Sequence, residues 1–233
     1  VNAWDTDLTL ADLDAIVVDG LDGITLPKCS GLADVRRLDD EITRLEKLRG
    51  LPVGKIKIAI LIETALGVLT VDESVGGSSR LVAVIFGAVD YTRDMRVTRT
   101  DKADEQFYAR AKIGVAARAH GLVAEDAPFP NYSDVEAFEA NCRSGAQLGF
   151  EGRQIINPRQ IAAAHKVYSP DPARVEWAKK ITKVFEEEGL AKGSASVGFE
   201  GSMIDIPVYR DGLNILARQK EIEEKEAARG AKA

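Results

Sequence analysis

Five short runs of apolar, often β-branched residues recur along the chain, and each is nearly continuous rather than alternating with polar residues. Continuous apolar runs of this length are typical of strands that are buried on both faces, as in a parallel sheet. The pattern therefore predicts five strands, at residues 23–28, 57–63, 81–88, 121–126 and 153–157.

Between these runs, apolar residues recur with the spacing of amphipathic helices. Ser133 stands three residues before Glu136, which matches a capping box and indicates a helix start. Gly121 and Gly149 stand just past two predicted helix ends, where a left-handed residue often closes a helix. We expect four such helices, at residues 8–18, 33–48, 103–119 and 134–148.

The strand ends follow one another at intervals of 27 to 36 residues, about the length of one strand–helix unit. This repeat predicts an α/β fold with parallel strands, either a doubly wound sheet or a TIM (βα)8 barrel. No Gly-x-Gly-x-x-Gly motif follows a strand, so a dinucleotide-binding sheet has no support. Polar residues at several of the strand ends favour the barrel, because the catalytic residues of such barrels lie at the carboxyl ends of their strands. The strand ends are Pro27, Glu63, Asp90, Asp126 and Asn157.

Val1–Asn2 resembles the end of a further strand, which brings the expected total to six. A closed barrel of this type needs eight strands, so we expect the barrel to lack its first two βα units in this chain. We predict that residues 1–168 form this partial barrel as the catalytic domain.

The pattern changes after residue 168, and we predict that residues 169–233 form a helical extension or lid. Its two expected helices lie at residues 173–188 and 208–228. Residues 189–202 between them are rich in Gly, Ser and Ala, which predicts a flexible linker.

The composition is that of a globular protein with a sizeable core, since 45% of residues are hydrophobic and 29% are charged. The net charge of −6 argues weakly against a nucleic-acid partner. No apolar run approaches the roughly 18–20 residues needed to cross a bilayer, and the first seven residues do not resemble a secretory signal. We therefore expect no membrane association. Cys29 and Cys142 are expected to be free thiols in a reducing cytoplasm.

Two acidic residues, Glu63 and Asp90, close consecutive apolar runs. On neighbouring parallel strands their carboxylates would lie at the same rim, where they could hold a hard cation such as Mg²⁺. The alternative is that each acid simply favours the N-terminus of the helix that follows its strand. The residues alone leave these two interpretations evenly balanced.

Five motifs, in this order and at these intervals, closely resemble the citrate lyase β-subunit-like family of the HpcH/HpaI aldolase superfamily. The resemblance extends from Val1 to about Ala217. The motifs are LIETALGV at 61–68, FGAVDYTRDM at 86–95, EDAPFPNYSD at 125–134, LGFEGRQIINPRQI at 148–161 and GSMIDIP at 201–207.

The resemblance implies a (βα)8 barrel with a C-terminal extension that reaches a neighbouring subunit, in homotrimers or hexamers. It also implies a Mg²⁺-dependent enzyme, with Mn²⁺ as an alternative ion and coenzyme A (CoA) as part of the substrate. The expected activity is reversible retro-Claisen or aldol cleavage of a 3-hydroxyacyl-CoA into an acyl-CoA and a 2-oxo acid. Malyl-CoA, β-methylmalyl-CoA and citramalyl-CoA are the expected kinds of substrate.

By resemblance, Glu63 and Asp90 are catalytic metal ligands and Asp205 is the general acid/base supplied to an adjacent subunit. The alternative role of Asp205 is the N-cap of the last helix. Backbone N–H groups of Ala88 and Val89 are candidates to bind the substrate carboxylate. One departure from the family is the absence of an arginine that normally precedes Val-Asn and faces the thioester. Another is Asn157, where many relatives have His.

Asn2 and Lys28 are expected at strand ends on the same rim and are further substrate-binding candidates. Lys28 could equally pair with an acid. Arg93 begins a basic cluster with Arg96 and Arg99, which could meet the phosphates of CoA. The alternative is a solvated loop in which these arginines pair with Asp94 and Asp101.

Three other functions remain open from the sequence. A malyl-CoA thioesterase would use the same metal site, and a related aldolase would act on free 2-oxo acids without CoA. The third alternative is a non-catalytic barrel, either a binding or regulatory subunit or an inactive fragment.

Overall fold

The computed structural model describes residues 1–100 and 102–230 of the chain. Its contacts divide the chain into two compact units, Val1–Ala164 and His165–Ala233, which are described separately below. This division falls inside helix α7 (Ile161–Tyr168), whereas the predicted domain boundary lies at the end of that helix.

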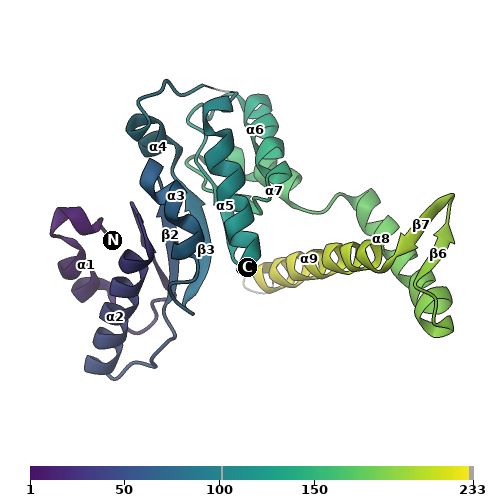
Figure 1. Cartoon of the computed structure of the whole chain (residues 1–233), viewed down its shortest axis with the longest axis horizontal. Helices are drawn as coiled ribbons and strands as arrows, with labels where there is room; N and C mark the ends of the chain where they lie inside the picture. The colour runs from purple at the N-terminus through teal and green to yellow at the C-terminus, as the bar shows by residue number, and fades with distance from the viewer. Residues whose placement is uncertain (101, 231–233) are drawn as a thin grey trace. The chain divides into compact units, whose positions relative to one another are not determined.

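The first unit is built on a parallel sheet whose strands pair in chain order from β1 to β5 (Figure 1). The prediction of an α/β fold with a parallel sheet is therefore confirmed. Within the described residues no pairing joins β5 back to β1, so closure into a barrel stays a prediction. The strands are β1 (Gly23–Leu26), β2 (Lys57–Ile62), β3 (Leu81–Phe86), β4 (Val123–Asp126) and β5 (Gly152–Arg153).

Helices lie alongside this sheet, with α2, α3 and α5 close to the strands (Figure 1). In β2 the alternate residues Ile58, Ile60 and Ile62 are fully buried, whereas Ala59 and Leu61 are only half-buried. One face of β2 is thus fully buried, and its other face is covered less completely than the prediction of strands buried on both faces supposed. The helices are α1 (Thr9–Ile16), α2 (Leu32–Leu48), α3 (Ala65–Ser74), α4 (Ala88–Asp94), α5 (Phe107–Ala119) and α6 (Val135–Gln147).

Several local predictions were wrong. Val1–Asn2 is not part of a strand, and the last predicted strand shrinks to Gly152–Arg153. Helix α3 was missed because its sequence, ALGVLTVDES, carries a glycine and β-branched residues and lacks a clear polar stripe. Helix α6 begins at Val135 with Asp134 as its N-cap, not Ser133, because the Asp134 carboxylate accepts the N–H of Ala137.

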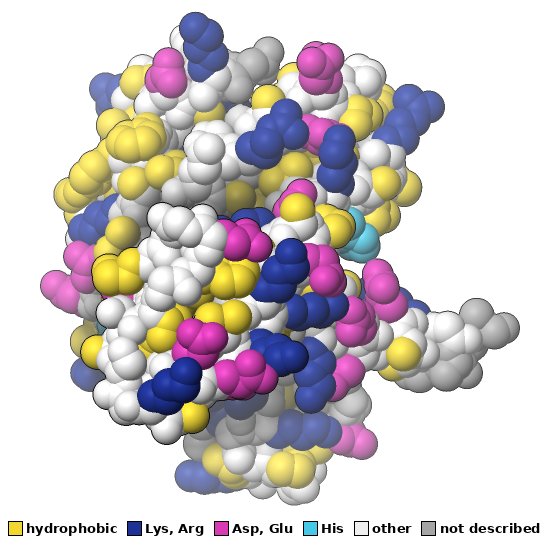
Figure 2. Space-filling view, turned by 90° about the vertical axis from the view of Figure 1, so that its right-hand side faces the viewer, with side chains coloured by type: hydrophobic (Ala, Val, Ile, Leu, Met, Phe, Trp, Pro, Cys, Tyr) yellow, Lys and Arg dark blue, Asp and Glu magenta, His cyan; other side chains and the backbone are white. Residues whose placement is uncertain are grey.

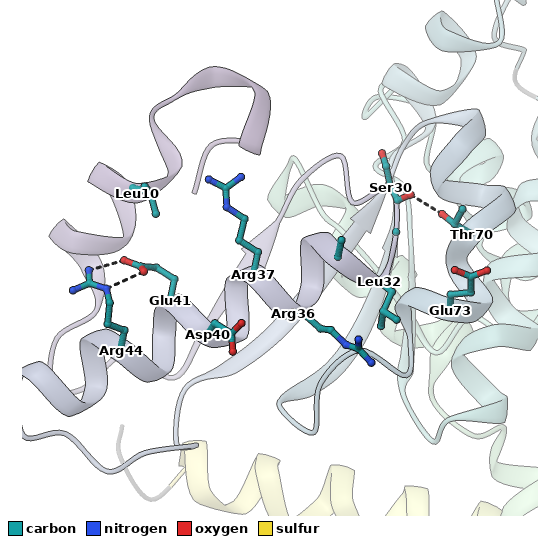
Figure 3. A pocket seen from close by; sticks show the side chains of 12 residues that line it. Leu10, Ser30, Leu32, Arg36, Arg37, Asp40, Glu41, Arg44, Thr70 and Glu73 are labelled. Carbon is teal, nitrogen blue, oxygen red and sulfur yellow. Dashed lines mark hydrogen bonds and ion pairs between the residues drawn. The ribbon is translucent and has the colours of Figure 1, made fainter.

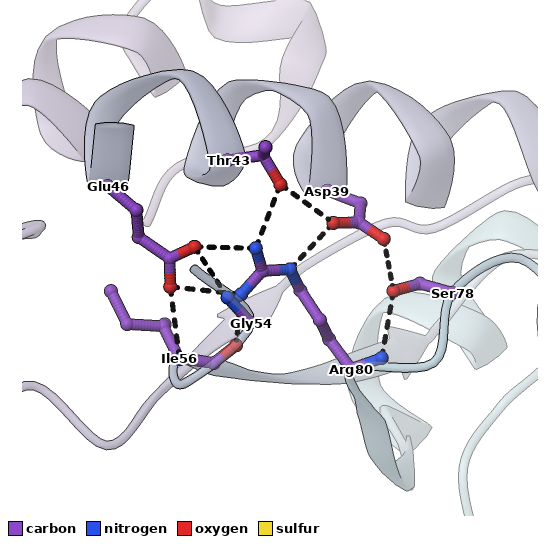
Figure 4. Close-up of polar contacts among 7 residues, drawn as sticks. All are labelled: Asp39, Thr43, Glu46, Gly54, Ile56, Ser78 and Arg80. Atoms are coloured by element: carbon purple, nitrogen blue, oxygen red, sulfur yellow. Dashed lines mark hydrogen bonds and ion pairs between the residues drawn. The ribbon is translucent and has the colours of Figure 1, made fainter. Parts of the chain in front are cut away.

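A buried arginine, Arg80, connects helix α2 to the starts of β2 and β3 (Figure 4). Its guanidinium contacts Glu46 at 2.6 Å and Asp39 at 2.6 Å, and it also donates to the carbonyl of Ile56 at 3.0 Å. The Arg80 side chain is 4% exposed and that of Glu46 is fully buried. Burial alone would raise the pKa of Glu46, but hydrogen bonds from Arg80 and from backbone N–H groups outweigh it and hold that pKa below its usual range.

Replacing Arg80 with Met is expected to destabilise the protein by about 3–5 kcal/mol, because it leaves the Glu46 carboxylate buried without its counter-ion. In the wild type, ionised Glu46 adds to the free energy of unfolding at pH values above the pKa that it has in the unfolded chain. This contribution is lost as the pH falls through the lower pKa that Glu46 has in the folded protein. Urea unfolding at several pH values measures both effects. The matched control is Arg118→Met, whose exposed pair with Glu151 is expected to contribute less than about 1 kcal/mol. Equal losses in the two variants would contradict this interpretation.

The second unit packs helix α8 (Pro172–Val184) and helix α9 (Ile206–Gly230) against a β-hairpin of β6 (Ser196–Phe199) and β7 (Ser202–Asp205). The predicted flexible linker is therefore wrong over its second half. Glu200 and Gly201 have positive φ angles of 45° and 78°, which suit a two-residue hairpin turn. The hairpin is held by an apolar cluster of Ile181, Phe185 and Ile204, on which Trp177, Val197, Phe199, Val208 and Tyr209 pack.

No helix within the two described stretches of the chain is long and apolar enough to cross a membrane. Cys29 and Cys142 are buried and are not joined in a disulfide, and burial raises the pKa of the Cys29 thiol to about 11. On the face shown in Figure 2, Lys and Arg side chains are mixed with Asp and Glu side chains rather than gathered by sign.

Candidate metal and substrate site

Glu63 follows strand β2 directly and is only 6% exposed. Its Oε1 accepts the backbone N–H of Lys28 at 3.0 Å. Lys28 has a positive φ of 50°, an unusual conformation for a residue other than glycine, which turns the chain after β1. The neighbouring strand end therefore holds the Glu63 carboxylate through its main chain.

Gly87 lies directly against Glu63 on the side away from Lys28. Its N–H donates to the carbonyl of Ile62 at 2.9 Å, so the residue after β3 lies directly beside the end of β2. A Cβ atom on Gly87 would stand 2.5 Å from Glu63 Cβ and 2.7 Å from Glu63 Oε2. The carboxylate thus occupies space that any side chain at position 87 would need.

Asp90 lies in the first turn of helix α4, three residues after Gly87, rather than at the end of a strand as predicted. The strand stops at Phe86 because the Gly87 backbone turns into the helix, where Tyr91 donates its N–H to the Gly87 carbonyl. Asp90 is one-third exposed and forms an ion pair with Arg93 one turn later in the same helix.

The two carboxylates are close enough to act on each other. Burial raises the pKa of Glu63, and the negative charge of Asp90 raises it further. The Lys28 N–H and the more distant charges of Lys28 and Arg93 oppose this rise without cancelling it. A pair of like charges with oxygen donors is the kind of site that a hard divalent cation stabilises. Within the described residues no group of three or more metal-binding side chains occurs, so water and substrate oxygens would complete such a shell.

Lys28 and Asn2, the two rim residues predicted to bind substrate, have protein partners. The Lys28 ammonium pairs with Asp5 at 3.3 Å, in the short 3-10 turn at residues 4–6. The Asn2 amide and backbone N–H both donate to the Asp12 carboxylate, at 2.8 and 2.7 Å. Their substrate-binding role stays a prediction.

Ala88 and Val89 are the first two residues of helix α4, directly before Asp90, and their N–H groups lie outside the helical ladder. Ala88 is buried and Val89 is exposed. Their role in carboxylate binding remains a prediction.

Arg93 is exposed and pairs with Asp90, so its predicted contact with CoA remains untested. Asp94, which was expected to pair with these arginines, instead accepts the N–H of Ala65 at 2.7 Å at the start of helix α3. The alternative partner Asp101 lies outside the described residues.

Asp205 belongs to the second unit and is the last residue of β7. Its carboxylate accepts the N–H of Val208 at 3.1 Å, in the first turn of helix α9. The capping role weighed as the alternative is therefore present in the structure. This contact does not test the catalytic role.

Sequence reasoning missed Gly87 and the main chain of Lys28 as parts of this site. The available signal was the glycine that follows the apolar run of β3, since a glycine at such a place often marks a close approach of another group. The identity of that group, Glu63 from a different strand, could not be read from the local sequence.

A groove with a volume of about 990 Å³ lies elsewhere on the first unit (Figure 3). It is lined by residues of α1, α2 and α3 and by the turn at Ser30 and Gly31. Arg44, which pairs with Glu41, lies on its wall together with Arg36 and Arg37, whereas neither Glu63 nor Asp90 lines it.

Comparison with known proteins places this site in context. The family model for HpcH/HpaI aldolase/citrate lyase matches residues 1–158. The chain belongs to this family. The resemblance inferred from the five motifs is thereby confirmed.

Two relatives within the family have different names. The chain is 39% identical to the citrate lyase subunit beta of Leuconostoc mesenteroides subsp. cremoris over 89% of this chain and 68% of that protein. It is 31% identical to an L-malyl-CoA/beta-methylmalyl-CoA lyase of Rhodobacter capsulatus over 95% of this chain and 75% of that protein.

Among solved structures, CitE from Mycobacterium tuberculosis, in complex with magnesium, acetoacetate and coenzyme A, aligns with a TM-score of 0.75. That alignment has 28% sequence identity and covers 94% of this chain and 76% of the other.

Proposed function

We propose that this protein is a Mg²⁺-dependent carbon–carbon lyase that cleaves a 3-hydroxyacyl-CoA into an acyl-CoA and a 2-oxo acid. The observation that carries the proposal is the pair of carboxylates, with Glu63 buried and its pKa raised by burial and by Asp90. Family membership, relatives named as lyases and a neighbour bound to magnesium and coenzyme A support it.

Glu63 and Asp90 would hold the metal ion, which when bound lowers the pKa of the substrate hydroxyl and polarises the oxo acid in the reverse direction. The Lys28 N–H orients the Glu63 carboxylate, and the lack of a side chain at Gly87 leaves the room that this carboxylate occupies. The Arg93 guanidinium lies against Asp90 and balances part of the negative charge of the pair.

The N–H groups of Ala88 and Val89 would bind the substrate carboxylate beside this pair. Asp205 of an adjacent subunit would protonate the enolate carbon after cleavage, or remove the methyl proton in condensation. This step requires a homo-oligomer, for which we propose a trimer or hexamer. We also propose that the five-stranded sheet is part of a (βα)8 barrel.

The test is a turnover assay of the protein in the presence of Mg²⁺ and malyl-, β-methylmalyl- or citramalyl-CoA. Free thiol and released oxo acid are measured together. Oxo acid without free thiol is the expected result for a lyase, whereas thiol without oxo acid would identify a thioesterase instead. Absence of both products with all three substrates would contradict the proposal.

Gly87→Ala is expected to weaken Mg²⁺ or Mn²⁺ binding by about 10–100-fold, because its new Cβ would displace the Glu63 carboxylate. Isothermal titration calorimetry measures the binding without any need for turnover. Gly152→Ala is the matched control, since a Cβ there would meet no atom within 4 Å. If both variants bound the ion like the wild type, the close contact between Gly87 and Glu63 would have no role in the site.

A further inference from the structure

A second cluster of charged side chains is buried around the end of strand β4. The Asp126 carboxylate accepts from Arg110 of helix α5 at 2.5 Å and from Arg153 of β5 at 2.9 Å. The Asp126 side chain is 1% exposed, and the two arginine side chains are each 2% exposed. One carboxylate therefore faces two guanidinium groups, which leaves this buried cluster with a net charge of +1.

The cluster lies on the opposite face of the sheet from the proposed metal site. Leu61 pairs with Ile85 and Ile85 pairs with Glu125, so these three residues share one face. Side chains alternate along a strand, so Asp126 points to the other face, where helix α5 packs. Glu63, two residues after Leu61, belongs to the first face.

Among the described residues, the remaining hydrogen-bond partners of the two arginines are neutral. Arg110 donates to Ser144 Oγ and to the Asn141 carbonyl, both at 3.4 Å, and Arg153 donates to Asn141 Oδ1 and approaches Cys142 Sγ at 3.4 Å. The buried Nε of Arg153 has no hydrogen-bond partner within the described part of the chain. Neutral acceptors do not balance a charge, and an unbalanced buried charge is costly.

A cavity of about 170 Å³ adjoins the cluster and is lined in part by Arg153. Arg99, Gln106 and Asn141 also contribute charged or polar side chains to its wall, and Ala127 and Phe129 contribute apolar surface. At about 30 Å³ for each water molecule in the liquid, this volume is enough for an oxyanion of four or five heavy atoms with accompanying water.

We propose that this cavity binds one small oxyanion, whose negative charge balances the Arg110–Asp126–Arg153 cluster. Arginine suits this role because its planar guanidinium presents several donors to phosphate or carboxylate oxygens. Glu105, whose neighbour Gln106 lines the cavity, forms no ion pair with Arg110 or Arg153 among the described contacts, and its carboxylate accepts from Thr100 and Gln106. The inference does not depend on the proposed lyase activity.

The test measures binding of inorganic phosphate and of acetate to the whole chain by isothermal titration calorimetry and thermal unfolding. Ionic strength is held constant with sodium chloride. We expect saturable binding with one site per chain, and a rise in Tm of roughly 5 °C when the anion exceeds its Kd about 100-fold. A larger response to phosphate would indicate a tetrahedral ligand, and a larger response to acetate a planar one.

Two variants separate this site from general salt effects, since phosphate also stabilises proteins by exclusion from their surface. Arg153→Met leaves Arg110 and Asp126 as a neutral pair, and Ser144→Asp adds a carboxylate beside Arg110. Both variants are expected to lose the saturable response. Their controls are Arg118→Met and Asn214→Asp, exposed positions with matching charge changes, which are expected to keep it.

Absence of saturable binding in the wild type would mean that the cavity holds only water, and the proposal would be overturned. An unchanged response in Ser144→Asp or Arg153→Met would also overturn it. If Arg153→Met does not fold, Ser144→Asp decides, because it keeps both arginines and Asp126 in place.

Discussion

Glu63→Gln is expected to abolish specific Mg²⁺ binding and to lower kcat/KM by roughly 10³-fold or more on the acyl-CoA that the wild type cleaves. Glutamine keeps the size of the side chain and can still accept the Lys28 N–H, so the fold around β2 is preserved. What is lost is the negative charge that a divalent cation requires. Because burial and Asp90 raise the pKa of Glu63, wild-type binding is also expected to weaken as pH falls, earlier than for an ordinary glutamate.

Two measurements check this prediction, metal binding by calorimetry and turnover by release of the oxo acid. The control is Glu139→Gln, a partly exposed glutamate that pairs with Arg143 on the outer helix α6. It is expected to bind Mg²⁺ like the wild type. Wild-type metal affinity in Glu63→Gln would exclude this residue as a ligand, whatever the activity of the chain.

Asp205→Asn is expected to lower kcat by about 10²- to 10⁴-fold, the usual contribution of a general acid or base. Asparagine caps a helix N-terminus about as well as aspartate, so the contact with the Val208 N–H and the stability of the second unit should change little. This separates the capping role, which the structure contains, from the proposed catalytic role. Metal binding should be unaffected.

Subunit mixing tests where Asp205 acts. If Asp205 serves the site of an adjacent subunit, a mixture of Glu63→Gln and Asp205→Asn chains should regain part of the activity that each variant lacks alone. Full activity of Asp205→Asn by itself would show that the carboxylate is only a helix cap. If the mixture regained no activity, Asp205 would act only in the active site of its own chain.

The strands of the first unit were predictable because a residue buried between a sheet and its helices must be apolar, and β-branched residues suit such strands. The hairpin at residues 196–205 was not predictable in the same way. Its glycine and serine content resembles a linker, and it is ordered because Val197, Phe199 and Ile204 of the hairpin pack on Ile181 and Phe185, which lie outside it. Helix α3 was also not predictable, because its apolar and polar residues do not alternate with the 3.6-residue period of an amphipathic helix.

By itself, the sequence determined the parallel α/β sheet and the family, because apolar runs and short motifs are local properties of the chain, and it singled out the two acidic residues of the proposed site. The tertiary structure decided how those acids are held. The contact of Glu63 with Gly87, its hydrogen bond from Lys28 and the raised pKa depend on three strand ends meeting in space. It also decided that Asp126 meets two arginines beside a cavity. Burial and charge balance arise only when distant segments pack together, so no local pattern could specify them.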